Sequence, residues 1–189
     1  MFEHDVNITG KHATYIKFLA RKNAKEDPEE SSTKNAKIFE RYIDVYMNAV
    51  VWGLLYGKRA KRDISSEDRA RIYADAFAAE HDNCVFLYRM AMLLDTSTGL
   101  SPQERVDRAF RDDTLPDPDR LTRNMELFHD YVRGGIEFMY TQFTNGCTTP
   151  EDYLTRTYEV LRAYEDDIKY RDEQECSISY DEEISKLLK

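Results

Sequence analysis

The stretch IFERYIDVYMNAVVWGLLYG, residues 38–57, decides the fold that we predict for this chain. From Val45 to Gly57 it contains no charged residue, and Asn48 is its one strongly polar side chain. A helix that is apolar on every side has to be covered on every side. We therefore predict that the other helices pack around this one and that it forms a buried core.

Composition predicts the same class of fold. Of the 189 residues, 41% are hydrophobic and 33% are charged, which is typical of a folded domain with a charged surface. With 7 Gly and 5 Pro, the chain has too few turn residues for an all-β protein. We predict an all-α fold, an irregular bundle of about six or seven helices around a central apolar helix. We expect one domain over 1–189, with its core at 10–168 and a charged C-terminal extension at 169–189.

Helix boundaries follow from capping residues and apolar spacing. Four of the five prolines come directly after a good N-cap residue, where proline suits the first helical position. Gly134-Gly135 interrupts one predicted helix and either kinks it or lets a neighbour approach closely. The polar stretch Glu80–Asn83 predicts a bend or a split in another. The predicted helices cover about 10–23, 35–60, 67–95, 102–112, 118–144, 150–168 or beyond and, weakly, 180–188, with 38–57, 84–94 and 125–143 at the centre.

The remaining segments are predicted as irregular. Residues 1–9 form an extended or loosely ordered lead, and 22–34 a surface loop. No alternating pattern is long enough to predict a strand. Two apolar stripes are expected to face the core: Ala70, Tyr73, Phe77, His81, Cys84, Tyr88 and Ala91 in one helix, and Leu154, Tyr158, Leu161, Tyr164 and Ile168 in another.

Cysteine usage bears on the compartment. The three cysteines, Cys84, Cys147 and Cys176, are odd in number and contain no CxxC pair. This pattern argues against a disulfide framework and against a zinc site built on thiolates. The uncharged run of 13 residues is too short for a membrane-spanning helix, which needs about 20. We therefore expect a cytoplasmic location without a membrane segment.

The charge of the chain is unevenly distributed. The net charge is −9, yet four basic residues follow the apolar helix within five positions: Lys58, Arg59, Lys61 and Arg62. Cations at a helix C-terminus are favoured by its dipole, and they can also pair with acidic residues of the same chain. Alternatively, this basic cluster binds an acidic or phosphate-bearing protein partner. Nucleic acid is a further alternative, which the negative total disfavours.

Histidines suggest a different alternative. Three of the four histidines precede an aspartate, and an adjacent His-Asp pair supplies ligands in metal-dependent phosphohydrolases of the HD type. Such sites need several N and O ligands from different helices to hold a divalent metal and activate a water. The residues that could supply them here are His12, His81, Asp82, His129 and Asp130. The competing interpretation is that His81 lies in the core stripe, hydrogen-bonded through one ring nitrogen.

No catalytic motif is complete. The glycine before Lys11 lacks the partner residues of a phosphate-binding loop, and no G-x-S-x-G sequence occurs. We therefore predict a non-enzymatic helical interaction module or accessory subunit that binds a protein partner and needs no cofactor. The sequence leaves enzymatic activity and homo-oligomer formation open. The alternatives are an HD-type phosphohydrolase and a nucleic-acid-associated protein.

Overall fold

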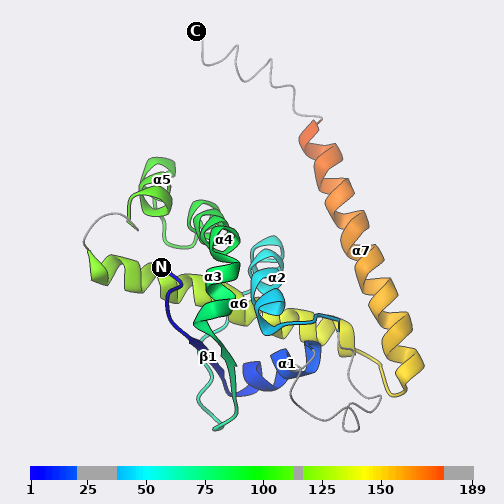
Figure 1. The fold of residues 1–189 in the computed structure, drawn as a ribbon. Helices are drawn as coiled ribbons and strands as arrows, with labels where there is room; N and C mark the ends of the chain where they lie inside the picture. Colours follow the sequence, from blue (N-terminus) through cyan, green and yellow to red (C-terminus); the bar gives the residue numbers. More distant parts are fainter. Residues whose placement is uncertain (21–37, 113–116, 177–189) are drawn as a thin grey trace.

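The computed structural model describes residues 1–20, 38–112 and 117–176, with side chains up to 171. Helices dominate the described part, which confirms the predicted all-α bundle (Figure 1). The predicted loop at 22–34 and helix at 180–188 lie outside the described residues. The elements are β1 (Val6–Thr9), α1 (Lys11–Leu19), α2 (Tyr42–Leu55), β2 (Arg69–Ile72), α3 (Ala74–Ala79), α4 (His81–Leu94), α5 (Pro102–Phe110), α6 (Pro118–Thr144) and α7 (Pro150–Cys176).

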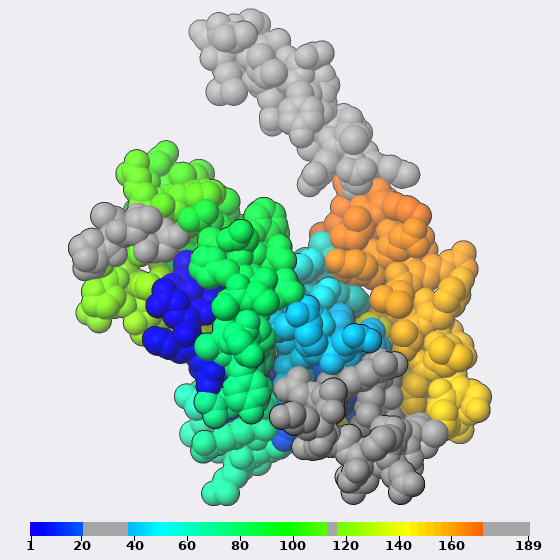
Figure 2. Space-filling view, in the orientation of Figure 1, coloured from blue at the N-terminus to red at the C-terminus, as the bar shows by residue number. Residues whose placement is uncertain are grey.

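The apolar helix α2 is the spine that the sequence predicts. Between Val45 and Tyr56, the only exposed side chain is Asn48. Its most extensive contact is with α6, and α4, α1 and β2 pack on its other sides. In the space-filling view, α2 lies between the green surface of α3 and α4 and the orange surface of α7 (Figure 2).

Helix α2 is shorter than the predicted 35–60. Residues 38 and 39 are extended, because the backbone N–H groups of Ile38 and Phe39 both donate to the carbonyl of Leu19 at 3.0 Å. At the other end Gly57, with φ of 62°, allows Lys58 N–H to donate to the Gly53 carbonyl at 2.7 Å. This is a Schellman termination, which satisfies carbonyls that the helix leaves unpaired.

Glycines set the spacing between α2 and α6. A Cβ on Gly135 would lie 1.8 Å from the backbone oxygen of Ala49. A Cβ on Gly53 would lie 2.5 Å from the oxygen of Tyr131, so the close contact involves glycines of both helices. Of the two interpretations of Gly134-Gly135, close approach of a neighbouring helix is therefore what the structure supports.

The prediction of no strand is wrong. Strands β1 and β2 pair antiparallel, with Val6 opposite Ile72 and Thr9 opposite Arg69. Residues 67–73 were predicted as the start of a helix, but Ala70 and Ile72 point into the core while Arg69 and Arg71 are exposed. A four-residue alternation is too short to distinguish a strand from one turn of helix. The hydrogen bonds from β1, which the local sequence does not reveal, decide the outcome.

Several other helix predictions are confirmed. The predicted split occurs, since α3 ends at Ala79 and α4 begins at His81. Ser101 and Glu104 form a capping box at α5: Ser101 N–H donates to the Glu104 carboxylate at 2.8 Å, and Glu104 N–H donates to Ser101 Oγ at 3.3 Å. Asp117 caps α6 by accepting from two backbone N–H groups.

Helix α7 differs from its prediction in orientation. It continues to Cys176, so the first part of the predicted extension at 169–189 is helical. Its inner face is formed by Val160 and by Tyr164, which stacks on Trp52 with ring centroids 4.9 Å apart. Most of the predicted core stripe instead faces outward, because the helix is rotated relative to that prediction. The exposed members are Leu154, Tyr158, Leu161 and Ile168.

Candidate functional site

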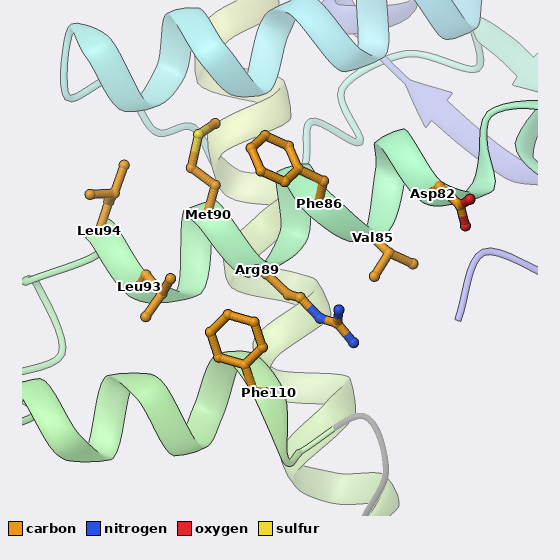
Figure 3. A pocket seen from close by; sticks show the side chains of 8 residues that line it. All are labelled: Asp82, Val85, Phe86, Arg89, Met90, Leu93, Leu94 and Phe110. Atoms are coloured by element: carbon orange, nitrogen blue, oxygen red, sulfur yellow. The ribbon is translucent and has the colours of Figure 1, made fainter.

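An apolar groove follows α4 beside α5 (Figure 3). Its volume is about 520 Å³. In the close-up, Phe86, Met90 and Leu94 extend from one side of α4, and Phe110 faces α4 from α5. Six of the eight lining residues are apolar, namely Val85, Phe86, Met90, Leu93, Leu94 and Phe110, and the other two are Asp82 and Arg89.

The groove exposes large apolar side chains to solvent. Phe86 is 66% exposed, Leu94 59% and Phe110 48%. From Cys84 to Leu94 helix α4 is apolar nearly all round, but its buried residues are only Cys84, Leu87, Tyr88, Ala91 and Met92. Single exposed apolar residues are ordinary, whereas a contiguous exposed apolar patch marks a site of interaction.

One cation lies within this apolar surface. The guanidinium carbon of Arg89 is 5.3 Å from the centroid of the Phe110 ring, a cation–π arrangement that joins the two helices across the groove. Asp82 lies at the N-terminal end of the groove, where its carboxylate is 3.3 Å from His81 Nδ1. A ligand in the groove would therefore meet apolar side chains with a positive charge among them.

A buried polar network holds α4 and α5 together. The Asp95 carboxylate, fully buried, accepts from Ser97 Oγ at 2.6 Å and from the Tyr131 hydroxyl at 2.9 Å. Arg108, 4% exposed, lies 3.4 Å from the same carboxylate and donates to the Met92 carbonyl at 2.5 Å. Burial raises the pKa of Asp95, but these hydrogen bonds outweigh burial and leave its pKa below 3.8. This network fixes α4 against α5 at the wall of the groove.

The basic cluster interacts largely with its own chain. Lys58 Nζ lies 5.4 Å from the Phe138 ring centroid. Arg59 donates to Ser97 Oγ at 2.5 Å and lies 3.7 Å from Asp95 Oδ1. The other two also have partners: Lys61 Nζ lies 2.5 Å from Asp130 Oδ2, and Arg62 Nε lies 3.4 Å from Thr9 Oγ1. These contacts are the intramolecular alternative described above, and binding of a partner by the cluster stays a prediction.

The histidines occupy three separate places. His12 is buried in α1, with Nε2 2.8 Å from Glu137 Oε1. His129 Nε2 is 3.0 Å from the Tyr46 hydroxyl. His81 is exposed at the start of α4, so its predicted place in the core stripe is wrong. The reason is that α3 and α4 are separate helices at this point.

No metal centre forms around these residues. Asp130 is paired with Lys61 and with Arg133, whose Nη2 lies 2.6 Å from Asp130 Oδ1. Across the ranges 1–20, 38–112 and 117–171, no three His, Cys, Asp or Glu side chains come together as metal ligands. The structure therefore offers no geometric support for the hydrolase, which stays a prediction.

A second pocket, of about 320 Å³, lies between β1 and α6. It is polar: Asp5, Arg62, Glu126, His129 and Arg133 line it. Its charges are largely paired, since Arg133 contacts both Glu126 and Asp130, and Asp5 pairs with Arg71. The pKa of His129 falls to about 4, chiefly because burial disfavours the imidazolium and also because Arg133 lies nearby.

His129 predicts a loss of stability at mildly acidic pH. The unfolded chain binds a proton on this imidazole near pH 6.5, while the native protein binds it only near pH 4. Stability is therefore lost as the pH falls through this window, by roughly 2 kcal/mol for this group. Urea unfolding at pH 7 and pH 4.5 measures the effect. The His129→Gln variant is expected to show a shallower pH dependence, and an unchanged slope would contradict the assignment.

The described cysteines lack the character of catalytic nucleophiles. Cys84 and Cys147 are free thiols. Burial raises the pKa of Cys84 to about 11, so this thiol stays protonated at neutral pH. The thiolate is the reactive form of cysteine, and Cys84 therefore acts as an apolar core residue.

Comparisons with protein-family models, with curated proteins and with solved structures found no match. Within the described ranges, no helix is both long enough and apolar enough to cross a membrane. The fold and the groove together define a helical protein with an open apolar surface.

The groove was not predicted from the sequence, although a signal for it exists. The segment Cys84–Leu94 is apolar nearly all round, as the spine is. We expected both at the centre of the bundle. In the structure, neighbouring elements cover α2 almost completely but cover α4 only in part. The difference depends on how many elements pack on each helix.

Proposed function

We propose that this protein is an interaction module whose groove along α4 and α5 binds the apolar face of a helix from a protein partner. The observation that carries this proposal is the contiguous exposure of Phe86, Leu94 and Phe110 on a preformed surface. A helix laid in an apolar groove is a recurring mode of peptide recognition, with side chains at i, i+3, i+4 and i+7 as anchors.

The charges of the groove narrow the chemistry of the partner. Arg89 favours a helix that carries an acidic residue among its apolar anchors. An ion pair between these groups would set the register of the helix more than it would add affinity. We therefore expect the partner helix to be apolar with an acidic residue. An acidic partner was also expected from the sequence, but there the binding surface was the basic cluster, and here it is the groove.

We further propose that the protein acts in the cytoplasm. An odd number of cysteines supports a reducing compartment, as do the free thiols of Cys84 and Cys147. Binding of nucleic acid by the basic cluster receives less support, because these four residues contact side chains of the same chain.

The groove variant Phe86→Asp is expected to abolish capture of the partner. Burying a phenylalanine stabilises a complex by about 2 kcal/mol, which corresponds to roughly 30-fold in Kd, and a buried carboxylate costs more. The measurement is affinity capture with the wild-type chain and the variant side by side. Phe86 is 66% exposed, so the fold is expected to survive, which circular dichroism checks.

The matched control is Ile64→Asp. Ile64 is 82% exposed and does not line the groove. A protein that the wild type and the control retain, and that Phe86→Asp loses, supports the proposal. If all three chains retain the same proteins in the same amounts, the groove is not the binding surface.

A further inference from the structure

Helix α7 presents a second uncovered apolar face on the same chain. Leu154 is 75% exposed, Tyr158 66%, Leu161 48% and Ile168 41%. Their spacing of four, three and seven residues places them on one side of the helix. We call these four residues the α7 stripe. It is an amphipathic face of the kind that an apolar groove accepts.

The α7 stripe faces away from the body of its own chain. Val160, on the inner side of the helix, is 6% exposed, and Tyr164 stacks on Trp52 of α2. These contacts fix which side of α7 packs on the molecule. Figure 1 shows the C-terminal end of α7 projecting beyond α2. The stripe is therefore available to another molecule.

The charges of the two faces are complementary. Within the α7 stripe lies one charged residue, Glu165, one turn from Leu161 on one side and from Ile168 on the other. The corresponding cation of the groove is Arg89, which likewise has apolar side chains one turn away on both sides. An ion pair with Glu165 would add to the contacts that Arg89 makes within its own chain, such as the Phe110 ring, and it would bring apolar residues of both helices into contact on either side.

We infer that the helix bound in the groove is α7 of a second copy of this chain. This inference rests on the proposed function of the groove and names its occupant. In a pair related by a twofold axis, each copy keeps α7 on its own body and places the α7 stripe in the groove of the other copy. Both grooves are then filled, and the assembly closes as a dimer. Within its own helix Glu165 forms an ion pair with Lys169, with Nζ and Oε1 2.6 Å apart. Both side chains are more than 60% exposed, so Glu165 can turn toward Arg89 of the second copy.

Four chains test this inference by analytical ultracentrifugation over a range of concentrations. The wild type is expected to form a dimer, and Phe86→Asp and Leu161→Asp are each expected to remain monomeric at the concentration where the wild type is dimeric. The control Ile64→Asp, outside both faces, should dimerise as the wild type does. Circular dichroism and thermal unfolding verify that each variant is folded.

Mixing the two variants gives the sharpest readout. The Phe86→Asp copy keeps an intact stripe and the Leu161→Asp copy an intact groove, so the mixture should regain a heterodimer through one of the two contacts. A dimer that Leu161→Asp abolishes but Phe86→Asp leaves intact would show pairing of α7 with α7 and overturn the inference. A wild type that is monomeric throughout would also overturn it. If Phe86→Asp still loses a captured protein in that case, the proposed function stands.

Discussion

The Gly135→Ala variant is expected to lose about 3 kcal/mol or more of its free energy of unfolding. Two effects of opposite sign compete at this position. Alanine is the better helix former by about 1 kcal/mol, so propensity alone predicts stabilisation. The added Cβ, however, would lie 1.8 Å from the Ala49 oxygen and 2.9 Å from its Cα. Both are backbone atoms, which a rotamer change cannot move, so α2 and α6 have to separate.

Urea unfolding followed by circular dichroism measures this loss. The matched control is Gly99→Ala: Gly99 has a φ of 69° and nothing within 4 Å of an added Cβ. Its cost is confined to the left-handed backbone, about 1–2 kcal/mol. If Gly135→Ala proves as stable as the wild type, the close approach of the two helices is wrong.

The second large effect is expected from Asp95→Ala. The carboxylate is fully buried and holds Arg108, Tyr131 and Ser97 at the junction of α4, α5 and α6. Removing it leaves the Arg108 guanidinium buried with less compensation. Breaking a buried ion pair from one side costs about 3–5 kcal/mol. Thermal and urea unfolding of the variant measure the loss.

An exposed pair provides the control for this variant. Glu159 is 58% exposed, lies 3.5 Å from Arg156 and belongs to neither apolar face, so Glu159→Ala is expected to change stability by less than about 1 kcal/mol. An Asp95→Ala variant that unfolds at the same urea concentration as Glu159→Ala would show that the network does not hold the groove wall.

Local signals account for what the sequence predicted correctly. The capping box at Ser101 and the cap at Asp117 involve residues at most three positions apart, so they are visible in the sequence. The spine was predictable because a long uncharged run has few alternatives to burial. The separation of α3 from α4 before His81 was predictable from the polar residues at positions 80–83.

The failures concern partners distant in sequence. Strand β2 depends on β1, whose paired residues lie 60 to 66 positions earlier, and nothing near Ala70 indicates that pairing. The orientation of α7 depends on the stacking of Tyr164 on Trp52, which competes with an equally apolar stripe on the adjoining face. The groove was unpredictable for the same reason. Phe86 is as apolar as a core residue, and it is exposed only because no other element of the chain packs on it.

Two methionines on α4 provide the most direct test of the groove as a binding surface. Met90 lines the groove, whereas Met92, on the same helix, is fully buried. The measurement is the methyl NMR spectrum of methionine-labelled protein with and without its bound partner, whether a second copy or a captured protein. Our account predicts that the Met90 signal shifts on binding while the Met92 signal stays in place. A Met90 signal that is unchanged in the fully formed complex would contradict it.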